Sequence, residues 1–168
     1  MATWSGIRAK LEKEYLAPSL RGHITYFATS YSRCPDHEGR AAVLYDGKEI
    51  LKSNYYEHMI SQSIQYYKSK DDESGLSSSE KWRKAFDLAL NEGTFDQTYF
   101  YEAFGKFDNQ DIKQSLVSEN PIVRLFAILD RRVGKRTLIN LMERIENELE
   151  WLKPFYFIRL EAENITYN

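Results

Sequence analysis

The stretch that decides the fold is residues 40–51, RAAVLYDGKEIL, in which two short apolar runs flank Asp46 and Gly47. A two-residue hairpin turn of type I′ needs positive φ at both central positions, and Asp-Gly adopts this conformation at little steric cost. The preceding stretch, GHITYFATSY at residues 22–31, is rich in Thr, Tyr, Phe and Ile, as strands are. We therefore predict a three-stranded antiparallel meander over about residues 22–52.

Most of the remaining chain has the apolar spacing of helices. Residues 3–16 predict a short helix that Ser5 can cap, and Ser77 with Glu80 forms a capping-box pattern before another. Asp96 and Asn120 are further candidate caps, and Pro121 suits a first helical turn. In the helix predicted after the meander, the residues that repeat at helical spacing are Tyr56, Met59, Ile60, Ser63, Ile64 and Tyr67.

The C-terminal third predicts three helices. Gly134 interrupts a stripe that runs from Ile122 to Val133, and the next helix carries Leu138, Leu141, Met142, Ile145, Leu149 and Leu152. Residues 154–165 fit a strand or a helix, and Pro154 at the start favours a helix. We therefore predict one α+β domain over residues 1–168, mostly helical, with the small meander near the N-terminus and a flexible polar loop at about 69–79.

Composition narrows the classes of function. The 168 residues carry a formal net charge of −2 and a pI near 6.0, so a protein that coats nucleic acid is not expected. The single cysteine allows no internal disulfide, and the first sixteen residues lack the apolar stretch of a secretory signal. No apolar run reaches membrane length. We predict a cytoplasmic protein that does not bind membranes.

The strongest local charge feature is LDRRVGKR, residues 129–136. Arg131 and Arg132 fall at a predicted helix C-terminus, where the helix dipole favours cations. Lys135 and Arg136 fall at the start of the next helix, where the dipole disfavours them. A bound anion would remove this conflict, and so would an acidic partner within the chain, with Asp130 the nearest candidate. These four basic residues are the candidate anion- or partner-binding site.

Other chemistry has weaker signals. The segment CPDHEG offers Cys34, Asp36, His37 and Glu38, but it lacks the CxxC or HxxxH spacing of a metal site, so we predict no metal. A nucleophilic pair of Cys34 with a distant histidine stays open. There is no GxSxG, glycine-rich phosphate loop or HExxH, so we name no catalytic residue and expect no cofactor.

Four segments carry a resemblance to a family. NPIVRLFAILDRRVGKRTL, GRAAVLYDGKEIL, NEGTFDQTYFYEAF and FYFIRLEAE resemble a family of small uncharacterised bacterial proteins with a DRRVGKR-like segment. The resemblance covers nearly the whole chain and implies a bacterial cytosolic protein of one domain. It implies no activity, cofactor or catalytic residue.

Two functions from different classes remain open. The first is a non-enzymatic binding or protein-interaction module, indicated by the aromatic-rich composition and the lack of a catalytic pattern. The alternative is a protein, and possibly an enzyme, that binds a phosphate or another small anion through Arg131, Arg132, Lys135 and Arg136. The orientation of Lys135 and Arg136 would distinguish the two.

Overall fold

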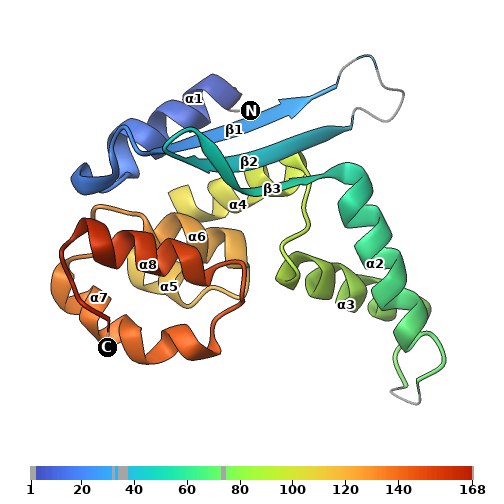
Figure 1. Ribbon diagram of the computed structural model, residues 1–168. Coiled ribbons are helices and arrows are strands. Elements are labelled where there is room, and N and C mark those ends of the chain that lie inside the picture. The colour runs from blue at the N-terminus through green and yellow to red at the C-terminus, as the bar shows by residue number, and fades with distance from the viewer. Residues whose placement is uncertain (1–2, 32, 34–37, 73–74, 168) are drawn as a thin grey trace.

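The predicted meander is present in the computed structural model, which describes residues 3–31, 33, 38–72 and 75–167 (Figure 1). Strands β1 (Ile24–Ser30), β2 (Gly39–Tyr45) and β3 (Lys48–Asn54) pair antiparallel in that order. Asp46 and Gly47 join β2 to β3 with φ of 48° and 77°. Positive φ at both positions confirms the turn that the Asp-Gly pair predicted.

One face of the sheet packs on the body of the protein. Ile24, Tyr26 and Ala28 of β1 are buried, whereas Phe27 on the opposite face is exposed. Helix α1 (Trp4–Ala9) and the π-helical turn η1 (Lys10–Tyr15) run beside β1, and the short helix η2 (Pro18–Leu20) follows. The cap of α1 is Thr3 and not Ser5, because the Thr3 Oγ1 accepts the Gly6 amide at 3.3 Å.

The core lies between the sheet and a group of helices. Figure 1 shows α4 and α6 next to the sheet and α8 beyond them. The rings of Phe100 and Phe107 each contact that of Phe126, and all three side chains are buried. Asp96 and Asn120 cap α4 and α6 as predicted, and the helical alternative for the last segment is confirmed. The bounds are α4 Gln97–Asp108, α5 Ile112–Leu116, α6 Pro121–Ile128 and α8 Lys153–Ala162.

The single helix predicted to carry Leu138 through Leu152 is wrong. Helix α7 spans only Lys135–Leu141, the 3-10 helix η3 spans Met142–Asn147, and Glu148 is extended with φ −82° and ψ 161°. This backbone turns the Glu148 side chain inward to Arg124, with an Nη2–Oε1 distance of 2.8 Å. Both side chains are mostly buried, so each charge needs the other as its partner, and the extended backbone at Glu148 that allows this contact interrupts the helical run.

Helices α2 (Tyr55–Ser69) and α3 (Ser78–Asn91) form a hairpin that projects from the rest of the molecule (Figure 1). They pack mainly against each other. The capping box of Ser77 and Glu80 is confirmed. The polar loop predicted at 69–79 is shorter, because Ser69 ends α2 and Ser78 begins α3; its residues 73–74 lie outside the described residues. The chain is an α+β domain, mostly helical, as predicted.

Candidate functional site

The segment LDRRVGKR contains an ion pair between a buried carboxylate and a partly exposed arginine. The carboxylate of Asp130 is fully buried and accepts hydrogen bonds from Arg132 Nε at 3.1 Å and from Arg132 Nη2 at 2.8 Å. The backbone amide of Arg132 also donates to Asp130 Oδ1 at 2.6 Å. The hydrogen bonds that Arg132 donates to Asp130 raise the pKa of Arg132. The opposite charges of Asp130 and Arg132 therefore neutralise each other within the chain.

This segment also joins distant parts of the protein. The amide of Arg131 donates to the Tyr15 carbonyl at 2.7 Å, next to the N-terminal helices. The buried guanidinium of Arg159, in α8, donates to the Val133 carbonyl at 2.8 Å. The turn between α6 and α7 thus binds both ends of the chain, which gives its polar groups a structural role.

Two aromatic rings also contact Arg132 in this turn. Its guanidinium carbon lies 4.8 Å from the ring centre of Tyr15 and 5.3 Å from that of Phe107. The Tyr15 hydroxyl donates to Asp108 at 2.5 Å, and Lys10 Nζ lies 2.9 Å from the same carboxylate. Burial, together with the bond to Asp108, raises the pKa of Tyr15 to about 12. Burial would raise the pKa of Asp108, but the bonds from Tyr15 and Lys10 outweigh it and the pKa falls.

The other basic residues of the cluster point to solvent. Arg131, Lys135 and Arg136 are exposed, and none of the three side chains forms an ion pair with a described residue. Lys135 and Arg136 begin α7, whose cap Gly134 has no side chain to bond the first amides. The structure therefore separates the four predicted residues into Arg132, which is paired with Asp130, and three exposed cations that have no ion pair among the described residues.

The hairpin interior holds a buried histidine that the sequence did not single out. His58 is 1% exposed, and its ring packs against Phe86 and Tyr99 at centroid distances of 5.0 and 4.9 Å. Its Nδ1 lies 2.8 Å from the Thr94 carbonyl, so Nδ1 carries the proton, while buried Nε2 has no hydrogen-bond partner. Burial lowers the pKa of His58. The side chain is therefore neutral and ties α2 to the α3–α4 connection.

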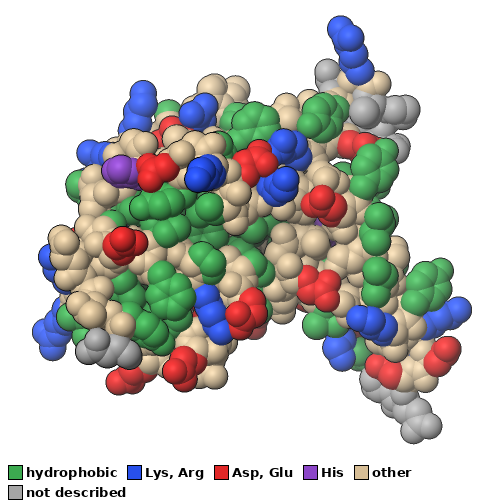
Figure 2. Space-filling view, in the orientation of Figure 1, with side chains coloured by type: hydrophobic (Ala, Val, Ile, Leu, Met, Phe, Trp, Pro, Cys, Tyr) green, Lys and Arg blue, Asp and Glu red, His purple; other side chains and the backbone are tan. Residues whose placement is uncertain are grey.

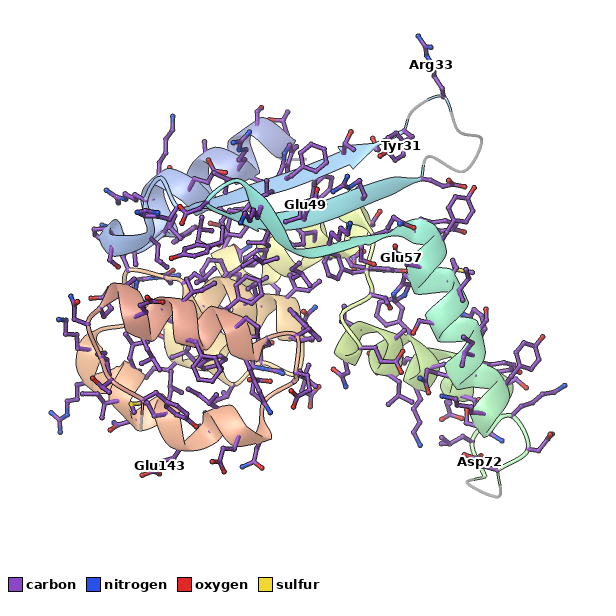
Figure 3. All side chains as sticks on the ribbon, viewed as in Figure 1. Tyr31, Arg33, Glu49, Glu57, Asp72 and Glu143 are labelled. Carbon is purple, nitrogen blue, oxygen red and sulfur yellow. The ribbon has the colours of Figure 1, made fainter. Side chains whose placement is uncertain are left out.

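The opposite side of α2 is apolar and exposed. Ile60 is 61% exposed, Ile64 49% and Tyr67 68%. Figure 2 shows hydrophobic side chains in a column along this helix, at the edge of the projecting hairpin. Figure 3 labels Glu57 beside its first turn and Asp72 just beyond its end. We call this surface the α2 face, and its residues are Tyr56, Met59, Ile60, Ser63, Ile64, Tyr67 and Lys68.

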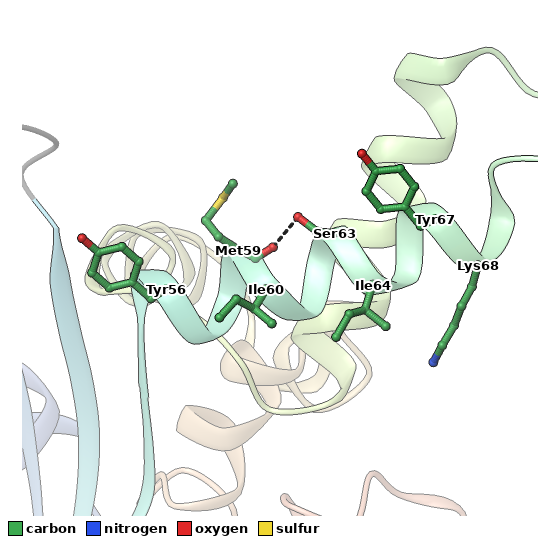
Figure 4. Close-up of a pocket in the computed structure, with 7 residues that line it drawn as sticks. All are labelled: Tyr56, Met59, Ile60, Ser63, Ile64, Tyr67 and Lys68. Atoms are coloured by element: carbon green, nitrogen blue, oxygen red, sulfur yellow. Dashed lines mark hydrogen bonds between the residues drawn. The ribbon is translucent and has the colours of Figure 1, made fainter.

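The side chains of the α2 face form rows of the kind that pack against another helix. Figure 4 shows Ile60, Ile64 and Lys68 along one row and Met59, Ser63 and Tyr67 along another. Rows of residues four apart form the ridges that helices use to pack on one another. The Ser63 hydroxyl donates to the Met59 carbonyl at 2.7 Å, so this small side chain folds back onto its own helix. The second row is therefore low at its middle, between two large residues.

The helical period found these residues, but it did not show that they are exposed. An apolar stripe normally faces the core. Here the buried positions of α2 are His58, Ser61 and Gln62, because they make hydrogen bonds to α3 and the α3–α4 connection. Ser61 Oγ donates to Glu92 at 2.6 Å, and Gln62 Nε2 donates to the Trp82 carbonyl at 3.2 Å. The polar stripe formed by these three residues was the sequence feature that could have indicated the buried side of α2.

Other candidate chemistry has little support in the described chain. Cys34, Asp36 and His37 lie outside the described residues. Among the residues that are described, no group of three or more His, Cys, Asp or Glu side chains is placed to hold a metal ion. Within the same residues, no helix has the length and apolar character needed to cross a membrane.

A protein-family model matches most of the chain. The model of the SF0329 protein family matches residues 3–160, which include the meander, the hairpin and the LDRRVGKR segment. The chain belongs to the SF0329 protein family. No curated protein and no solved structure matches it. The SF0329 match spans both the Asp130–Arg132 pair and the exposed α2 face.

Proposed function

We propose that this protein is a non-enzymatic interaction module that binds another protein chain through the α2 face. The observation that carries the proposal is the exposure of Ile60, Ile64 and Tyr67 on a single helix face. Contiguous exposed apolar surface on a folded domain marks an interaction site, because its burial releases about 25 cal/mol per Å². The face stands on a projecting hairpin, so a partner can reach it along its whole length.

The alternative function, binding of a phosphate or another small anion, has weaker support. Arg132 is engaged by Asp130, and the exposed cations Arg131, Lys135 and Arg136 are the remaining basis of this alternative. An anion site normally gathers several donors around one point, whereas the described chain commits its best guanidinium donor to an internal carboxylate. We therefore favour the interaction module.

The source and location of the protein belong to the same proposal. We infer a bacterial protein of the cytoplasm. The single cysteine supports a reducing compartment, and the resemblance of the DRRVGKR segment supports a bacterial source.

The test is site-specific photo-crosslinking in the organism from which the sequence comes. A photoreactive phenylalanine analogue replaces Ile64 of the α2 face, and a matched control carries it at Ile139, an exposed isoleucine of α7. We expect a discrete protein adduct from position 64 and none from position 139. Absence of any adduct at position 64, or equal adducts at both positions, would overturn the proposal.

A further inference from the structure

We propose that the α2 face binds the α2 face of a second copy of this chain, with the two helices antiparallel about a two-fold axis. The inference rests on the proposed function, since it names the partner of the same surface. It is carried by two independent features of α2, which are the order of its exposed apolar residues and the positions of its flanking charges.

The order of the large exposed side chains reads almost the same in both directions. It is Tyr56, Ile60, Ile64, Tyr67, and both the tyrosine pair and the isoleucine pair are centred on residues 61–62. A two-fold interface uses the same patch on both subunits, so the patch must complement itself when reversed. Reversal places each isoleucine beside an isoleucine and each tyrosine beside a tyrosine. The low position at Ser63, near the centre, gives the opposing isoleucines room.

The flanking charges favour the antiparallel orientation. Glu57 and Lys68 are eleven residues apart, which is about three helical turns, so they lie on the same flank of the stripe at its two ends. Figure 3 places Glu57 at the start of α2, and Figure 4 places Lys68 at its end. An antiparallel pair brings Glu57 of each copy beside Lys68 of the other, whereas a parallel pair brings like charges to the same level.

Both charges are available for this contact. Glu57 and Lys68 are exposed, and neither forms an ion pair with a described residue. Exposed ion pairs contribute little affinity, but opposite and like charges at one position select between orientations.

The available area predicts a reversible dimer. Helix α2 has 15 residues and is about 22 Å long, so two such faces bury on the order of 1,000 Å² in total. This value is at the low end of specific interfaces, where complexes are weak or transient. We therefore expect association that depends on concentration.

The experiment is sedimentation velocity of the full chain from about 1 to about 300 µM. We expect the mass to rise from one chain to two. Ile64→Glu should weaken the dimer at least about tenfold, while the control Ile139→Glu should leave it unchanged. Circular dichroism checks that each variant is folded, which is expected because both isoleucines are exposed.

Charge exchange tests the orientation. Glu57→Lys alone and Lys68→Glu alone should each weaken the dimer, since each creates two like-charge contacts. An equimolar mixture of the two variants should regain it, because every such contact then joins opposite charges. Loss in both single variants without recovery in the mixture would overturn the antiparallel pairing.

The outcomes separate this inference from the proposed function. A chain that stays monomeric to the highest concentration, with a position-64 adduct to a different protein, overturns the second copy and keeps the interaction module. A monomer with no adduct overturns both. A dimer that Ile64→Glu does not weaken overturns the α2 face as its interface.

Discussion

Asp130 and Arg132, two residues apart, close on each other so that a fully buried carboxylate meets a guanidinium at 2.8 Å. The guanidinium also lies over the rings of Tyr15 and Phe107, which belong to the N-terminal segment and to α4. A buried carboxylate is costly unless it is paired and hydrogen-bonded. The pair therefore fixes the turn between α6 and α7 against two other parts of the chain.

The first prediction concerns this pair. Arg132→Ala should destabilise the protein by about 2–3 kcal/mol, because it leaves Asp130 buried with its main partner removed. The control is Arg131→Ala at the neighbouring exposed arginine, for which we expect a change within about 0.5 kcal/mol. Urea unfolding at pH 7 measures both. Equal effects of the two substitutions would contradict the structural role of Arg132.

The second prediction concerns the exposed cations at the start of α7. The double change Lys135→Gln, Arg136→Gln should leave the protein as stable or slightly more stable, by up to about 1 kcal/mol. The reason is that two positive charges leave the positive end of a helix and no acidic partner is left unpaired. Thermal unfolding in a buffer without sulfate or phosphate gives the difference.

Sulfate gives the second half of the same test. Excluded salts raise the melting temperature of any variant, so only an extra rise in the unchanged protein reports bound anion. We expect sulfate to raise the melting temperature of the protein and of the double variant equally. A larger rise in the unchanged protein would support the anion alternative instead.

The third prediction concerns the hairpin turn. Gly47→Val should destabilise the protein by about 1–3 kcal/mol, because a β-branched residue resists the φ of 77° at this position. The control is Gly105→Ala in α4, where an added Cβ meets nothing within 4 Å. Alanine favours helix, so this control should be neutral or stabilising. An unchanged melting temperature in Gly47→Val would show that the turn tolerates a side chain.

The elements with strong local chemistry were predictable from the sequence. The Asp-Gly turn, the Ser77–Glu80 capping box and the Asn120-Pro121 start each depend on residues next to one another in the chain. The break after Leu141 was not predictable in this way. The extended backbone at Glu148 ends this irregular segment and brings its side chain to Arg124, 24 residues earlier, and no local pattern shows that contact.

For the candidate sites too, the sequence showed the local pattern but not the contacts between distant residues. The concentration of charge at 129–136 was visible, but the buried position of Asp130 comes from the packing of the N-terminal segment, α4 and α8 around it. The apolar repeat of α2 was also visible. Its exposure follows from the hydrogen bonds that turn His58, Ser61 and Gln62 toward α3, and helical periodicity says nothing about which stripe finds such partners.

The last prediction follows from the buried His58. Its folded pKa is below the ordinary value of 6.5, because burial between Phe86 and Tyr99 disfavours the charged ring. Below about pH 6.5 the unfolded chain therefore binds a proton that the folded chain does not. The stability that His58 contributes is complete above its unfolded pKa and is lost as the pH falls through its folded pKa.

The measurement is the free energy of unfolding in urea between pH 7.5 and 5. We expect the unchanged protein to lose stability as the pH falls, with a contribution from His58 of up to about 1.4 kcal/mol per pH unit. In His58→Gln this contribution should disappear, and the curve should be flatter even if the variant is less stable at pH 7.5. The control His23→Gln, at an exposed histidine beside Asp46, should keep the steeper fall that belongs to His58. Parallel curves for the protein and His58→Gln would mean that the ring accepts a proton in the folded state as readily as in the unfolded one, against its buried and unpaired Nε2.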